Sequence, residues 1–190
     1  MKTSTDRILT THVGSLVRTP DIVELHIQKY LGEVTTPEQF QEAIRRGVQE
    51  VVKRQADIGV DIVDDGEYGK LNWIAYLGQR LKGTVTTDIR VAPEDGAKFW
   101  PEQDRYAEFY AAYLRHESVD WLPAAPSRDR YMGTQMTDYQ NLVCRAELEY
   151  MPGPLSQDIA NLTEALRNVR VEDAFMPVVA PGSIEIITNE

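Results

Sequence analysis

The stretch that decides the fold is Val60-Asp61-Ile62-Val63-Asp64-Asp65-Gly66-Glu67. Its apolar residues predict a short buried strand, which runs directly into a turn with three carboxylates and a glycine. Carboxylates this close raise one another's pKa, or they hold a cation or the ammonium group of a substrate. The alternative is a solvated acidic turn, but ligands in α/β folds bind at the carboxyl ends of strands. This position therefore favours a functional site at 64–67.

A long helix is predicted immediately before this strand. Thr36 is a favourable N-cap, Pro37 suits the first helical position, and Gln39 completes a capping box. Apolar residues recur with helical spacing over 40–56, and Gly59 stands where a left-handed C-terminal cap belongs.

A first strand is predicted in the opening segment, Ile8-Leu9-Thr10-Thr11-His12-Val13-Gly14-Ser15-Leu16, which breaks into a loop at Gly14. A strand, a long helix and a second strand form a βαβ unit, so the sheet is expected to be parallel. The sequence further predicts helices at 22–30, 73–81, 102–116 and 156–168, an edge strand at 84–91, and strands at 142–151 and 175–180.

Composition and charge exclude several classes of function. The 190 residues include 20 Lys and Arg against 30 Asp and Glu, which gives a formal net charge of −10. Binding to nucleic acid or to an anionic membrane surface needs a basic patch, so neither partner is expected. The single cysteine, Cys144, excludes an internal disulfide and a zinc site built on two or more cysteines. No signal peptide or membrane-spanning run is recognisable, and the chain is expected to be cytoplasmic.

Three of the predicted strands end in loops that carry Ser15, Glu67 and Ser183. Loops in this position carry the chemistry of (β/α)8 enzymes, but such a barrel usually needs about 250 residues. We therefore expect an α/β fold, the N-terminal half of a (β/α)8 TIM-type barrel. It is expected to form a single domain over 1–190 with an irregular insertion at about 70–150. Its open sheet edges call for a second polypeptide or for homodimerisation.

Several stretches, taken in order, resemble one known family. They are the opening segment quoted above, Asp61-Ile62-Val63-Asp64-Asp65-Gly66-Glu67-Tyr68-Gly69, Gly153-Pro154, Asp158-Ile159-Ala160-Asn161-Leu162, and the segment from Ala174 to Ser183. This ordered set resembles the cobalamin-independent methionine synthase family. It is more similar to the shorter methionine synthase-like branch, which includes the epoxyalkane:coenzyme M transferases. The resemblance runs from about Ile8 to Glu190, and the middle of the chain, 84–140, matches poorly.

The resemblance implies a (β/α)8 barrel that transfers an alkyl group to a zinc-bound thiolate. Zinc lowers the pKa of the thiol, so that a thiolate nucleophile exists at neutral pH. The family segment that matches 13–15 holds the carboxylate of the homocysteine acceptor, and the glutamate that matches Glu67 lies beside the acceptor's amino group and the metal. The site expected on this basis has Glu67 as the catalytic residue and His12, Val13, Gly14, Ser15 and Asp65 as substrate-binding residues.

One departure from the family concerns the metal. Family zinc ligands include a His-x-Cys pair, and neither Cys144 nor any of the histidines (His12, His26, His116) forms one. No metal ligand is therefore assigned to this chain, and zinc is expected from a partner chain. The leading hypothesis is a subunit of a zinc-dependent methyl- or alkyltransferase that acts on a small thiol, with an alkyl donor such as a methylfolate. The alternatives are a non-catalytic ligand-binding or regulatory half-barrel, and a truncated product of a longer gene.

Overall fold

A computed structural model of the protein describes residues 2–30, 32–33, 36–71, 73–87, 104–109, 141–180 and 188–189. In chain order the elements are α1 (Pro20–Tyr30), α2 (Pro37–Asp57), β1 (Ile62–Val63), α3 (Trp73–Gly78), β2 (Leu81–Thr87), β3 (Asn141–Tyr150), α6 (Gly153–Leu166), β4 (Asp173–Ala174) and β5 (Thr188–Asn189). Most of the helix predicted at 102–116, and Ser183, lie outside the described residues. No described helix is long and apolar enough to cross a membrane.

The parallel arrangement predicted from the βαβ pattern is confirmed. Strand β1 pairs in parallel with β4, with Ile62 opposite Asp173 and Val63 opposite Ala174. On its other side, Ile62 forms a parallel bridge with Thr11, and the Ile62 N–H donates to the carbonyl of Thr10 at 3.0 Å. Three parallel segments therefore lie in the order Thr11, β1, β4. This is an α/β arrangement with short parallel strands.

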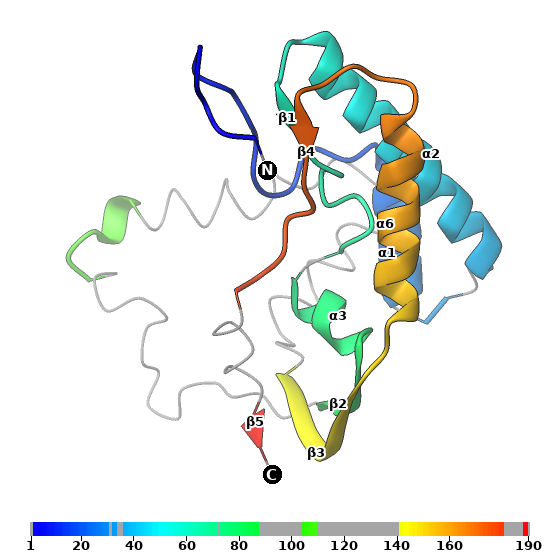
Figure 1. Cartoon of the computed structure of the whole chain (residues 1–190). Coiled ribbons are helices and arrows are strands. Elements are labelled where there is room, and N and C mark those ends of the chain that lie inside the picture. Colours follow the sequence, from blue (N-terminus) through cyan, green and yellow to red (C-terminus); the bar gives the residue numbers. More distant parts are fainter. Residues whose placement is uncertain are drawn as a thin grey trace.

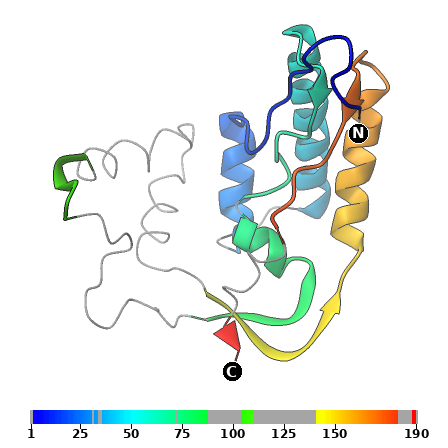
Figure 2. The ribbon, with the colours of Figure 1, turned by 60° about the vertical axis from the view of Figure 1, so that its left-hand side comes forward.

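Three helices cover this sheet. Helix α2 lies between α1 and α6, and the three run side by side along the molecule (Figures 1 and 2). Their facing sides form one core with Val63 of β1 and Tyr68 of the loop that follows it. The buried apolar residues of that core in the helices are Ile22, Phe40, Ile44, Val48, Val51, Val52, Leu162 and Ala165.

Helix α2 has the ends that its sequence predicts. The Gln39 N–H donates to Oγ1 of Thr36, the N-cap, at 3.4 Å, and Pro37 is the first helical residue. After the helix, Gly59 has a φ of +87°, the left-handed conformation that a glycine adopts without a Cβ clash. The predicted boundaries of this helix are therefore confirmed.

Three other predicted elements need correction. The first strand is reduced to the single bridge at Thr11. The last helix begins at Gly153 rather than near Ser156, because a proline such as Pro154 is tolerated in a first helical turn. The strand predicted at 175–180 is wrong, since the strand β4 precedes it and 175–180 is irregular. Pro177 has no N–H for a ladder, and its carbonyl accepts from the Lys70 ammonium instead.

A second, small sheet includes two strands from the region predicted as an insertion, 70–150. Strands β2 and β3 pair antiparallel and β5 adds to β3 in parallel, so this sheet has the order β2-β3-β5. It projects from the end of the molecule away from β1 and β4 (Figure 2). The register shifts between Lys82 and Thr84, where Gly83 has a φ of +88°.

Close packing at Gly47 gives a first testable expectation. A Cβ at this position of α2 would meet the side chains of Ile22 and, at 2.6 Å, Tyr68. Gly47→Ala is therefore expected to lower the free energy of unfolding by about 1–3 kcal/mol, as overpacking does. In an open helix the same change stabilises by up to about 1 kcal/mol. Chemical denaturation measures the difference.

The matched control is Gly153→Ala at the start of α6, where an added Cβ meets nothing within 4 Å. This variant is expected to be as stable as the wild type or slightly more so. Equal stabilities for the two alanine variants would show that α1 and the loop after β1 do not pack against α2 as described.

Candidate functional site

The loop after β1 is a tight turn with an unusual backbone. The Tyr68 N–H donates to the Asp65 carbonyl at 3.3 Å, and the two central residues, Gly66 and Glu67, have φ values of +60° and +56°. Two positive φ values are typical of a type I′ turn, whose central positions favour glycine or asparagine. Glu67 is the only described residue other than glycine with a positive φ. A left-handed residue with a Cβ costs about 1–2 kcal/mol, so surrounding contacts must hold Glu67 in this conformation.

This carboxylate meets the loop that follows the Thr11 segment. The Ser15 hydroxyl donates to Oε2 of Glu67 at 2.7 Å, and the Leu16 N–H donates to the Gly66 carbonyl at 3.1 Å. Gly14, with a φ of +100°, provides the bend before Ser15. The loops at the carboxyl ends of two neighbouring parallel segments therefore converge on one point, with a hydroxyl and a carboxylate at its centre.

Asp64 and Asp65 are buried, so the acidic turn is not simply solvated. Asp64 is 0% exposed; its Oδ1 accepts from the Gly66 N–H at 2.7 Å, while its Oδ2 has no partner among the described residues. Burial raises the pKa of Asp64 to about 6, and the charges of Asp65 and Glu67 contribute to this rise. Burial also raises the pKa of Asp65, against the opposing effect of the Lys70 ammonium.

A buried cation, Lys70, connects the turn to the rest of the site. Its Nζ lies 3.5 Å from Oε1 of Glu67 and donates to the Pro177 carbonyl in the segment after β4. The same Nζ lies 4.9 Å from the centroid of the Tyr76 ring in α3. Lys70 thus links the loop after β1, the segment after β4 and α3.

A second buried ion pair lies beside this cation. Arg80, after α3, pairs with Asp158 of α6, and its guanidinium carbon lies 3.2 Å from the centroid of the Tyr76 ring. Burial raises the pKa of Asp158 despite this partner. The Arg80–Asp158 ion pair and Lys70 therefore lie around the same ring, that of Tyr76.

The expected site residues lie in different environments. Ser15 and Glu67 come together, and Asp65 supports the turn by accepting from the Glu67 N–H at 3.0 Å. The His12 ring is half-buried, with Nε2 3.0 Å from the carbonyl of Gly14 in its own loop. Val13 is 70% exposed.

The described residues do not fit a zinc ion. No group of three or more His, Cys, Asp or Glu side chains in the described part of the chain is placed to hold a metal. Burial lowers the pKa of His26 to about 3, and its Nε2 lies 2.7 Å from the Tyr68 carbonyl, so its neutral ring is part of the core. Cys144, in β3, donates to the Ala146 carbonyl at 3.2 Å.

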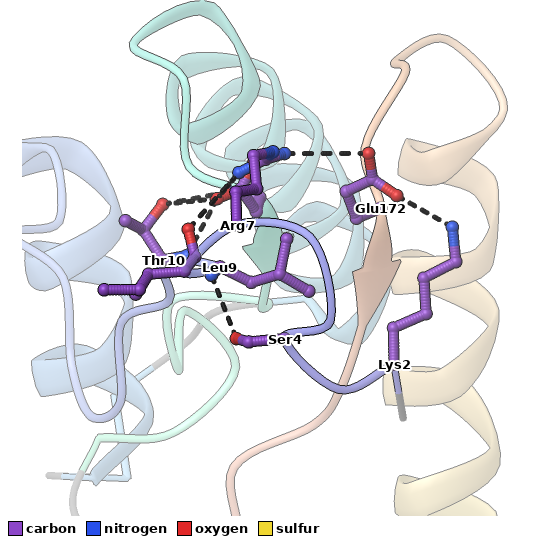
Figure 3. Close-up of polar contacts among 8 residues, drawn as sticks. Lys2, Ser4, Arg7, Leu9, Thr10 and Glu172 are labelled. Carbon is purple, nitrogen blue, oxygen red and sulfur yellow. Dashed lines mark hydrogen bonds and ion pairs between the residues drawn. The ribbon is translucent and has the colours of Figure 1, made fainter.

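The opposite end of β1 carries a structural network. Arg7 and Lys2 of the N-terminal segment converge on Glu172, next to β4 (Figure 3). Arg7 also holds Asp61 with two hydrogen bonds of 2.5 and 2.7 Å, and the pKa of that carboxyl is well below its usual range. A shallow hollow of about 310 Å³ lies here, lined by residues that include Arg7, Asp61, Arg170 and Glu172. Residues at this end of parallel strands usually contribute to stability rather than to chemistry.

The part of the chain that contains the turn is similar to a known family. Residues 8–92, which include both Ser15 and Glu67, match the family model "Cobalamin-independent synthase, Catalytic domain". This segment is similar to the catalytic domain of the cobalamin-independent synthases.

Individual relatives match over the same part of the chain. The 5-methyltetrahydropteroyltriglutamate–homocysteine methyltransferase of Bifidobacterium longum is 35% identical over 78 residues, which are 41% of this chain and 10% of that protein. The enzymes of the same name from Bacillus cytotoxicus and Corynebacterium efficiens are each 32% identical, over 74 and 78 residues. These matches cover 39% and 41% of this chain. The matched segment spans only 10% of the length of each relative.

Sequence reasoning missed two residues of the site, Lys70 and Arg18. Lys70 follows Glu67 by three positions, a spacing that could have indicated a pair, but its burial is set by α3 and by the segment after β4. Arg18 has no such local signal, because its partners are 49 and 52 residues away.

Proposed function

We propose that this chain is the acceptor-binding part of a methyl- or alkyltransferase that acts on a small amino-acid thiol of the homocysteine type. The observation that carries the proposal is the 2.7 Å contact between Ser15 and Glu67, at the carboxyl ends of neighbouring parallel segments. Both residues lie within the segment that matches the cobalamin-independent synthases. The strained backbone of Glu67 and the unpartnered oxygen of Asp64 support it, since such costs persist at functional sites.

The carboxylate and the ammonium group of the acceptor would each bind to a different loop. The Ser15 hydroxyl and the backbone N–H groups after Gly14 suit a carboxylate, because a glycine bend lets the backbone approach an anion. The carboxylate of Glu67 suits an ammonium group and would exchange its Ser15 contact for it. His12, Val13 and Asp65 would shape the site around these two contacts.

The rest of the proposed enzyme comes from outside this chain. A second polypeptide, or a second copy of this chain, would complete the sheet, and zinc and an alkyl donor such as a methylfolate would bind with that partner. Exposed apolar side chains support a partner: Ile8, Val13 and Val17 along the first segment and Val178 after β4 are all more than two-thirds exposed, at 85, 70, 72 and 68%.

Ligand binding is the direct test. Calorimetric titration of the full chain with L-homocysteine under reducing conditions is expected to show binding. 4-Mercaptobutyrate, which lacks only the amino group, is expected to bind about tenfold more weakly, because a charged hydrogen bond is worth about 1.5–3 kcal/mol. Ser15→Ala is expected to weaken both ligands about tenfold, since it removes a hydrogen bond to the carboxylate that both ligands carry.

The matched control is Ser4→Ala, at the other end of β1, where Ser4 accepts from the Leu9 N–H. It is expected to leave both affinities unchanged. Equal affinities of the wild type for the two thiols would contradict the role of Glu67.

The partner is tested separately. Purification from the native source is expected to give a complex with a polypeptide that carries a His-x-Cys pair, with zinc found by metal analysis. Turnover should then require both polypeptides and the donor. Binding of homocysteine without turnover in the complete mixture would favour a non-catalytic ligand-binding module, and a longer intact mass for this chain would show that the sequence is one part of a larger protein.

A further inference from the structure

We propose that Arg18 is a positioning residue of the acceptor site: its buried guanidinium holds the backbone of the 65–70 turn so that the Glu67 carboxylate points toward Ser15. The role in acceptor binding rests on the proposed function, whereas the hold on the turn rests on the contacts of Arg18 alone. It begins from the strain at Glu67, whose φ of +56° persists only where surrounding contacts hold it.

Arg18 supplies such contacts directly. It lies three residues after Ser15 and is only 5% exposed. One of its terminal nitrogens donates to the Glu67 carbonyl at 2.8 Å and to the Lys70 carbonyl at 2.5 Å. The Lys70 N–H donates to the same Glu67 carbonyl at 3.0 Å. A charged donor therefore binds both ends of the segment that follows the strained residue, and hydrogen bonds from a charged donor are about twice as strong as neutral ones.

Two further hydrogen bonds to backbone carbonyls join the two loops, and both have neutral donors. The Leu16 N–H donates to the Gly66 carbonyl, and the Tyr68 hydroxyl donates to the Val17 carbonyl at 2.8 Å. Residues 15–18 thus lie against the whole turn, and Arg18 is the charged member of this contact. Because the two hydrogen bonds that Arg18 donates to this turn end on backbone carbonyls, they would hold any residue at 67 in place, with its side chain pointing toward Ser15.

A test in the absence of ligand uses Arg18→Met with and without Glu67→Gly. In the wild-type background, Arg18→Met is expected to lower the midpoint of thermal unfolding by about 8 °C. In the Glu67→Gly background the drop is expected to be less than half as large, because glycine adopts a positive φ without restraint. The control is Arg46→Met, which removes an exposed partner of Asp21 and should add independently to Glu67→Gly.

Ligand affinity distinguishes a positioning role of Arg18 from a general contribution to stability. Arg18→Met is expected to weaken L-homocysteine about tenfold and 4-mercaptobutyrate less than twofold, since only the amino group depends on the direction of Glu67. Arg18→Lys, which keeps a charged donor, is expected to recover part of the difference. Should Arg18→Met fail to fold, Arg18→Lys is compared with the wild type by the same two readouts.

The outcomes distinguish the two proposals. Strictly additive midpoint shifts, or equal losses for both thiols, would overturn the positioning role while leaving the acceptor site standing. Non-additive shifts together with no binding of either thiol to the wild type would support the hold of Arg18 on the turn and overturn the proposed function.

Discussion

Replacement of Glu67 is expected to weaken acceptor binding strongly and to reveal the cost of its backbone conformation. Glu67→Gly and Glu67→Ala both remove the carboxylate, so both are expected to weaken L-homocysteine by about 30-fold or more, the value of a charged hydrogen bond in a partly buried site. The two variants differ in the energetic cost of the backbone conformation at position 67. With a φ of +56°, the glycine variant is expected to be more stable than the alanine variant by about 1 kcal/mol. Titration calorimetry and chemical denaturation measure the two effects.

The sign of that difference is diagnostic, because alanine is the more stabilising residue in ordinary conformations. Glu67→Gln provides the matched control: it keeps the shape and the strain and loses only the charge. It should bind homocysteine as poorly as the other two variants, and its free energy of unfolding should equal that of Glu67→Ala. An alanine variant more stable than the glycine variant would mean that residue 67 is not left-handed in solution.

Much of the α/β framework could be predicted because its signals are local. Helix α2 shows its N-cap, its proline and its apolar spacing within one segment, and Gly59 marks its end. The parallel pairing of β1 followed from the helix between two apolar segments. Strand β4 was misplaced because its pairing depends on Asp61 and Val63, whose carbonyls accept from Glu172 and Phe175 at 2.8 and 3.1 Å. Within 173–180 only Pro177, which has no N–H for a ladder, indicates that the pairing ends early.

In the candidate site, too, local features could be predicted and those set by distant contacts could not. The carboxylates after β1 could be predicted as a functional cluster from their position, and the structure brings Glu67 to Ser15. The positive φ of Glu67 and the hold of Arg18 could not be predicted, since both depend on contacts between segments about 50 residues apart. The sequence alone also left open a solvated turn at Asp64, and the burial of that side chain excludes it.

That burial leads to the second large effect. Asp64→Asn is expected to stabilise the protein increasingly as the pH rises. The pKa of Asp64 is about 6 in the folded state against 3.8 for an ordinary aspartate, so the folded state binds a proton more tightly than the unfolded state. The favourable contribution of the protonated carboxyl is fully present below about pH 4 and is lost as the pH rises through about 6. Relative to the wild type, the variant should gain about 2 kcal/mol of unfolding free energy between about pH 4.5 and about pH 7.5.

The comparison between pH values removes the effects of asparagine that do not depend on pH, such as an unpartnered amide hydrogen in place of the unpartnered Oδ2. Denaturant titrations of both proteins at each pH give the measurement. Asp57→Asn at the end of α2 is the control, because its carboxylate is exposed and pairs only with Lys53 among the described residues, so its difference from the wild type should stay small throughout. A constant stability difference for Asp64→Asn would mean that this carboxyl is hydrated. A difference that grows with pH would show that the fold keeps an ionised, unpaired group at the end of β1 at a cost in stability. Such a cost is expected where a site must meet a cationic or proton-donating ligand.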